Sequence, residues 1–100
     1  PETVLDLVNA ACGLDMDLDA LMLTGERAWN LKRRINLNLG LVGTNDRLPA
    51  PLLEPLNDGG AAGYVIPFDE MLAAYYTARG WDGSGIPTQE KLVELGIADL

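Results

Sequence analysis

The sequence contains no histidine and only one cysteine, Cys12. Without histidine, the chain cannot build Ser-His-Asp or Cys-His catalysis from its own residues, and it lacks the commonest metal ligand of proteins. A single cysteine cannot form a disulfide within the chain, nor hold zinc or an iron–sulfur cluster alone. We therefore expect Cys12 to be a small buried apolar residue on a first helix. We assign no catalytic, cofactor-binding or metal-binding residue to the chain.

Positive charge is also scarce: the sequence has seven Lys and Arg residues and 15 Asp and Glu residues, which gives a net charge of −8. An acidic surface repels phosphate groups, so we expect neither nucleic acid nor an anionic membrane as a partner. No apolar run approaches the roughly 18–20 residues that span a bilayer, and no secretory signal is visible. We expect a cytoplasmic protein. The start at Pro1, without an initiator methionine, suggests a processed chain, a trimmed one, or a fragment of something longer.

Apolar residues recur at helical spacing along the first 40 residues. A first helix over residues 2–12 is expected to end at Gly13, and a long one to begin after the N-cap Asp17 and end at Gly40. Its apolar stripe consists of Leu18, Leu21, Met22, Gly25, Ala28, Trp29, Lys32, Ile35 and Leu39. Further leucines lie off this stripe, so we expect a buried central helix. A glycine inside a helix is unfavourable, so Gly25 indicates a close helix crossing.

Residues 41–67 hold four prolines and four glycines, which excludes a long helix and predicts an irregular connection. Within it, residues 64–66 are a weak candidate for a short strand. A third helix is expected over residues 68–79, and a fourth over 89–95 with Thr88 as its N-cap. The prediction is an all-α fold: about four helices, one of them long and central, with a long Pro/Gly-rich irregular connection. Residues 1–100 would form a single helical domain or part of one.

Polar residues recur on the long helix at spacings of about three: Glu26, Arg27, Asn30, Arg33 and Asn36. They could face a substrate or cofactor cavity, or form a buried hydrogen-bond network that anchors residues 41–67 to the helix. We favour the network, in which Arg33 would either pair with Asp46 or donate to backbone carbonyls of the loop.

Two further groups of residues have structural explanations. The alternating acids Asp15, Asp17 and Asp19 suit helix capping better than a calcium loop, because Ala20 stands where such a loop needs glycine. Tyr75, Tyr76 and Trp81 suit packing in a core or between domains better than a binding cage.

Three phrases stand out by their order and spacing: Gly25-Glu26-Arg27-x-x-Asn30-Leu31-x-Arg33-x-x-Asn36, Asn45-Asp46-x-Leu48-Pro49, and Tyr75-Tyr76-x-x-Arg79-Gly80-Trp81-Asp82-x-x-Gly85-x-Pro87-Thr88-x-x-x-Leu92-x-x-Leu95-Gly96. Together they resemble the C-terminal end of the tungsten-containing aldehyde ferredoxin oxidoreductase family, from about Asn9 to Leu95. Ile35, Asn38 and Pro51 depart from the usual family residues and indicate a divergent member.

The resemblance implies a parent enzyme that oxidises an aldehyde to an acid. Such a parent binds a tungsten or molybdenum bis-pterin and a [4Fe–4S] cluster, and passes electrons to ferredoxin. The cluster cysteines of the family lie upstream of the matching segment, so no ligand role comes to Cys12. This segment would help enclose the cofactor and the substrate channel, be inactive alone, and have the remainder of the parent chain as its partner. Exposed apolar surface would also allow a homodimer.

The alternative is a stand-alone acidic helical module without catalysis. Its docking patch for another protein would consist of Tyr64, Tyr75, Tyr76 and Trp81.

Overall fold

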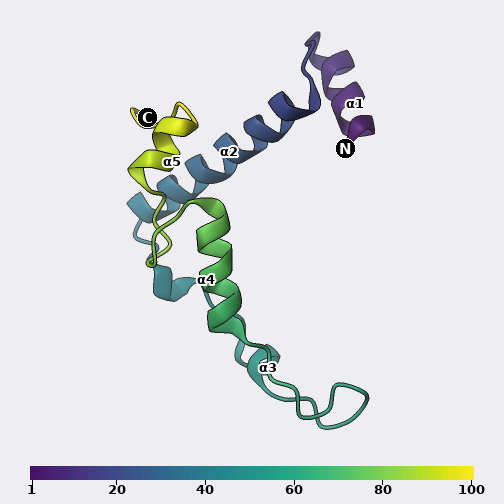
Figure 1. Ribbon diagram of the computed structural model, residues 1–100, viewed down its shortest axis with the longest axis vertical. Coiled ribbons are helices and arrows are strands. Elements are labelled where there is room, and N and C mark those ends of the chain that lie inside the picture. Colours follow the sequence, from purple (N-terminus) through teal and green to yellow (C-terminus); the bar gives the residue numbers. More distant parts are fainter.

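The computed structural model describes all residues from Pro1 to Leu100 and contains helices but no strands (Figure 1). The elements, in chain order, are α1 (Glu2–Cys12), α2 (Leu18–Asn38), the 3-10 helix η1 (Gly43–Asn45), α3 (Ala50–Leu53), α4 (Phe68–Arg79) and α5 (Gln89–Glu94). The all-α prediction is confirmed. Four helices match the predicted ones, and the extra helix, α3, is a single turn inside the Pro/Gly-rich connection.

Local chemistry sets the helix ends. The side chain of Asp17 accepts a hydrogen bond from the backbone N–H of Ala20 at 2.8 Å, and Thr88 accepts one from Lys91 at 3.2 Å. Gly13 and Gly80 follow α1 and α4 in the left-handed region, with φ of 66° and 69°. Because glycine enters this region without steric cost, both helices stop where the sequence predicts.

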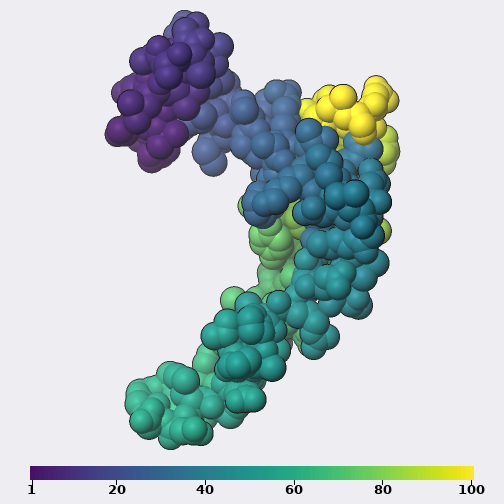
Figure 2. Space-filling model, turned by 180° about the vertical axis from the view of Figure 1, so that it is seen from behind, coloured from purple at the N-terminus to yellow at the C-terminus, as the bar shows by residue number.

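The chain is far more extended than a self-contained domain of its length. Its radius of gyration is 17.9 Å, and its extents are 53 × 32 × 21 Å. A compact domain of 100 residues has a radius of gyration of about 13 Å. Two arms project from a central body: α1 at one end, and α3 with the loop after it at the other (Figures 1 and 2). Only nine of 100 residues are buried.

The small core lies where the second half of α2 meets α4, α5 and the loop between those two helices (Figure 1). Its buried apolar residues are Tyr76, Trp81, Leu92, Leu95 and Ile97. On α2 the buried residues are polar, Asn30 and Arg33. The expectation that α2 is a buried apolar helix is therefore wrong for this chain, because the polar side of the helix faces the body.

Three local predictions also fail. Cys12 is exposed, since α1 contains no buried residue. A Cβ added to Gly25 would meet nothing within 4 Å, so no helix crosses α2 there within the chain. Residues 64–66 form no strand, because only isolated bridges exist and no neighbouring strand is present to pair with them.

None of the helices combines the length and the apolar character needed to cross a lipid bilayer.

Candidate functional site

Arg33, on the buried side of α2, holds two distant segments of the chain. Its guanidinium binds the Asp46 carboxylate with two donors: Nη1 donates to Oδ1 at 2.8 Å, and Nη2 donates to Oδ2. Its Nε donates to the backbone carbonyl of Gly85 at 2.9 Å. The predicted pairing of Arg33 with Asp46 is confirmed. This two-pronged geometry is the strong form of a charge-assisted hydrogen bond.

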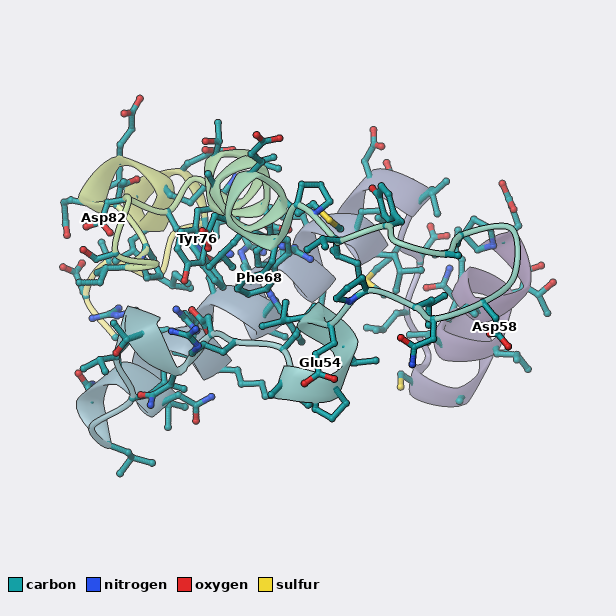
Figure 3. The ribbon with its side chains drawn as sticks, turned by 90° about the horizontal axis from the view of Figure 1, so that it is seen from below. Glu54, Asp58, Phe68, Tyr76 and Asp82 are labelled. Carbon is teal, nitrogen blue, oxygen red and sulfur yellow. The ribbon has the colours of Figure 1, made fainter.

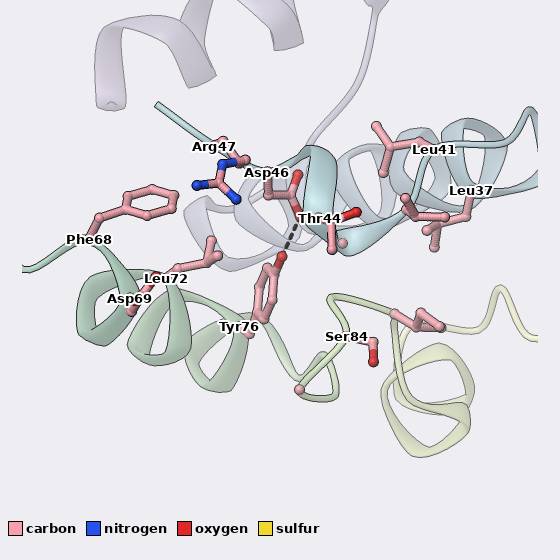
Figure 4. A pocket seen from close by; sticks show the side chains of 14 residues that line it. Leu37, Leu41, Thr44, Asp46, Arg47, Phe68, Asp69, Leu72, Tyr76 and Ser84 are labelled. Atoms are coloured by element: carbon pink, nitrogen blue, oxygen red, sulfur yellow. Dashed lines mark hydrogen bonds between the residues drawn. The ribbon is translucent and has the colours of Figure 1, made fainter. Parts of the chain in front are cut away.

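Tyr76 completes the cluster from α4 by donating its hydroxyl hydrogen to Asp46 (Figure 4). The hydrogen bonds from Arg33 hold the pKa of Asp46 below its ordinary value, against the opposing effect of burial. The bond to Asp46 raises the pKa of Arg33. Burial, and then the hydrogen bond to Asp46, raises the pKa of Tyr76. We call these three residues the Arg33 clamp.

The directions of the three pKa shifts decide what chemistry the Arg33 clamp can perform. Asp46 is ionised, and Arg33 and Tyr76 are protonated, across the neutral range. General acid–base catalysis needs a group whose pKa lies near the working pH. The shifts move all three residues away from that condition. The Arg33 clamp therefore suits holding the segment after α2 in place, and does not suit proton transfer.

A second set of polar contacts continues along α2. Asn30 is fully buried; its Nδ2 donates to Glu26, and its Oδ1 accepts from the Trp81 indole N–H at 2.8 Å. Glu26 also pairs with Arg79 at 2.9 Å. No buried side-chain polar atom lacks a partner. The favoured prediction of a hydrogen-bond network on α2 is confirmed in part: of the five predicted residues only Arg33 bonds to residues 41–67, Glu26, Arg27 and Asn30 bond to later segments, and the Asn36 side chain takes no part.

The network reaches further along the chain than predicted. Arg27 donates to the backbone carbonyl of Leu95, and Arg34 to that of Ile97, each at 2.7 Å. These two arginines fasten the C-terminal segment to α2. Sequence reasoning missed Arg34 and the target of Arg27, because their acceptors are backbone carbonyls, which carry no residue-specific signal.

Tyr76 and Trp81 pack in the core as predicted, whereas Tyr75 is partly exposed. Tyr76 and Trp81 are buried, their ring centroids lie 5.9 Å apart, and the Arg33 guanidinium lies 4.7 Å from the Trp81 ring. Tyr75 is 37% exposed and packs edge-on against Trp81. Its hydroxyl accepts a hydrogen bond from the indole of Trp29 at 2.8 Å. This last contact was not predicted.

A groove of about 720 Å³ opens beside the clamp (Figure 4). It lies among the C-terminal end of α2, η1, the N-terminal half of α4 and the loop before α5. Its walls are half apolar, with side chains from Leu37, Leu41, Val42, Phe68, Leu72 and Ile86.

Two glycines allow the chain to approach closely at this place. A Cβ on Gly43 would overlap the backbone carbonyl of Ser84, and one on Gly85 would overlap Arg33 and Tyr76. Both glycines are therefore needed for the geometry of the groove and the clamp.

A family model described as "Aldehyde ferredoxin oxidoreductase, domains 2 & 3" matches residues 1–97. The chain belongs to the aldehyde ferredoxin oxidoreductase family. The resemblance drawn from the three phrases is confirmed.

Curated relatives are named tungsten-containing aldehyde ferredoxin oxidoreductase. The protein of Pyrococcus furiosus is 44% identical over 97 residues. Those of Pyrococcus horikoshii and Thermococcus kodakarensis are each 43% identical over the same length. The aligned region covers 95% of this chain but only 16% of each relative.

The residues of this segment of the aldehyde ferredoxin oxidoreductase family do not fit a metal or cluster site. No group of three or more Cys, Asp or Glu side chains lies close enough to hold an ion. Glu54 and Asp58 lie apart from each other along the connection after α3, and Asp82 lies in the loop before α5 (Figure 3). The only cysteine, Cys12, is exposed on α1. We therefore assign no step of tungsten or iron–sulfur chemistry to these residues.

Proposed function

We propose that this chain is the C-terminal segment of an aldehyde ferredoxin oxidoreductase-like enzyme. The parent would oxidise an aldehyde to an acid and pass the electrons through a [4Fe–4S] cluster to ferredoxin. The segment would supply no reactive group and would be inactive alone. The observation that carries this proposal is the identity of 43–44% over nearly the whole chain, which covers only 16% of the relatives.

The segment's proposed role is to help enclose the cofactor and the substrate channel. Two features support it. The groove beside the Arg33 clamp is a concave, half-apolar wall. The clamp holds residues after α2 against α4 at this wall, and ion pairs buried in this way fix geometry more than they add stability. An enclosure needs such fixed walls, because a redox cofactor works only when protein groups position it and exclude competing reactions.

The alternative of a stand-alone interaction module has weaker support. Its docking patch requires four aromatic residues on one accessible surface. Tyr76 and Trp81 are buried in the body, whereas Tyr64 lies on the loop after α3. The patch therefore does not exist in the arrangement that this alternative requires.

The experiment is to purify the full-length protein that carries this sequence, anaerobically and after growth with tungstate. Tungsten and iron are measured by elemental analysis, and aldehyde-dependent reduction of ferredoxin is followed spectroscopically. We expect bound tungsten and iron together with aldehyde oxidation, which would depend on parts of the protein outside residues 1–100. A full-length protein with neither metal nor aldehyde-dependent electron transfer would overturn the proposal.

A further inference from the structure

One side of α2 has the residue pattern of a helix-packing surface, and all of its residues except the half-buried Leu21 are exposed. It consists of Leu21, Gly25, Ala28, Lys32 and Ile35, with Leu39 directly after the last residue of the helix, and we call it the outer face of α2. The spacings are 4, 3, 4, 3 and 4 residues. This alternation keeps side chains on one stripe of a helix and is typical of a seam between two helices.

The outer face is turned away from the body. The buried residues of α2, Asn30 and Arg33, lie on the other side of the helix. Ile35 is 50% exposed and Leu39 is 81% exposed. Gly25 and Ala28 are also exposed. In the view from behind, α2 lies at the molecular surface, in blue between the N-terminal arm and the C-terminus (Figure 2).

The chemistry of the outer face suits another helix. Gly25 and Ala28 are one turn apart and carry almost no side chain, which lets a second helix come close. Gly25 costs the helix about 1 kcal/mol relative to alanine, and no contact within this chain offsets that cost. The one charged residue of the face, Lys32, places its ammonium 5.0 Å from the centre of the Trp29 ring. The Lys32 charge is thereby drawn toward Trp29.

We propose that the outer face of α2 packs against a helix from the part of the parent polypeptide that lies outside residues 1–100, with the closest approach at Gly25 and Ala28. This inference rests on the proposed function, in that it requires a longer parent chain. The relatives offer ample chain for it, because the 97 aligned residues are 16% of their length, which corresponds to about 600 residues. A second copy is a poorer occupant, because two copies of residues 1–100, each with a net charge of −8, repel each other.

The first test is a cross-link within the full-length protein. A photo-reactive amino acid replaces Ile35, the protein is irradiated, and the linked peptides are identified by mass spectrometry. We expect a link within one polypeptide to a residue outside 1–100. A link between two copies, links confined to residues 1–100, or no link at all would each overturn the proposal. The control places the same photo-reactive amino acid at Val93, an exposed position on α5. The peptide linked from residue 35 should differ from the peptide linked from residue 93.

The second test enlarges the side chain at position 25, where the structure has glycine. In the full-length protein, we expect Gly25→Leu to lower the melting temperature, and Gly25→Ala to lower it less or leave it unchanged. If Gly25 faced solvent, both changes would raise the melting temperature, because Ala and Leu favour helix more than Gly does. That result would overturn the proposal. Gly60→Leu is the matched control, since a Cβ at Gly60 also meets nothing within 4 Å.

Failure of this inference and failure of the proposed function are distinguishable. A full-length protein that shows the expected cross-link but neither binds tungsten nor oxidises aldehydes would keep the packing proposal and overturn the proposed function. An active tungsten enzyme in which residue 35 links two copies would keep the proposed function and overturn the packing proposal.

Discussion

Replacing Asp46 by asparagine tests the Arg33 clamp while keeping the shape of the side chain. Asparagine still offers one oxygen to Arg33 and Tyr76, but it carries no charge. The Arg33 side chain is only 9% exposed, and the Asp46 side chain 22%. The change therefore leaves a guanidinium in a largely water-excluded place without its counter-charge.

The magnitude follows from this burial. Removing one partner of a buried ion pair costs about 3–5 kcal/mol. We expect about 2–3 kcal/mol here, because Asp46 is partly hydrated and the asparagine oxygen keeps one hydrogen bond. Since 1.4 kcal/mol corresponds to a factor of ten, the local opening equilibrium should rise by about 30- to 150-fold.

Hydrogen exchange measures this opening directly and does so whatever the length of chain that carries the residues. The reporters are the backbone amides of Asn45 and Asp46, which donate to Val42 and Gly43 at 2.8 and 3.0 Å. Asp58→Asn removes the same charge from an exposed loop and is the matched control. If Asp46→Asn accelerated exchange no more than Asp58→Asn, the reasoning about the clamp would be refuted.

The same clamp predicts a dependence on pH. The folded pKa of Asp46 lies below its unfolded value, which is about 3.9. Its stabilisation is therefore complete above that unfolded value and is lost as the pH falls through the lower folded pKa. We expect protection of the residue 45 and 46 amides, corrected for intrinsic exchange, to be constant near neutrality and to fall only below about pH 4. Asp46→Asn should abolish this acid-dependent step; its persistence in the variant would assign it to another group.

Two further substitutions test close packing near the clamp. Gly43→Ala should destabilise the protein by more than about 1 kcal/mol, because the new methyl group would overlap the backbone carbonyl of Ser84. Gly60→Ala, at an open position, is the control. Equal melting temperatures for the two variants would contradict the close approach of Gly43 to Ser84. Trp81→Phe should cost about 1–3 kcal/mol in the free energy of unfolding, because it leaves the buried Asn30 oxygen without a donor; a melting temperature equal to that of the unsubstituted protein would count against this bond.

Features of the fold that depend on neighbouring residues could be predicted from the sequence. The N-caps Asp17 and Thr88 and the terminating Gly80 act within a few residues of the helix ends that they determine. The bounds of α4 and the irregular course of residues 41–67 follow from the same local chemistry. The pairing of Arg33 with Asp46 was also predictable, because a buried arginine needs an acid and a nearby turn supplies one.

What the sequence could not reveal was which side of α2 faces the body. Apolar periodicity shows which residues favour burial, but it does not show whether the segment that buries them belongs to the same 100 residues. The predicted helix crossing at Gly25 and the predicted burial of Cys12 are wrong for this reason, because each requires a neighbour that these 100 residues do not contain. The close approach of Gly43 to Ser84 depends on backbone atoms distant in sequence, so no residue pattern signals it.

We propose that this chain is one part of a much longer tungsten enzyme, whose remaining parts cover its exposed apolar surface. Native mass spectrometry of the protein purified from its own cells is the decisive measurement for this proposal. We predict that the polypeptide containing this sequence is several times heavier than the 10.8 kDa of these residues and carries bound tungsten. A free polypeptide of about 10.8 kDa without metal would contradict this proposal.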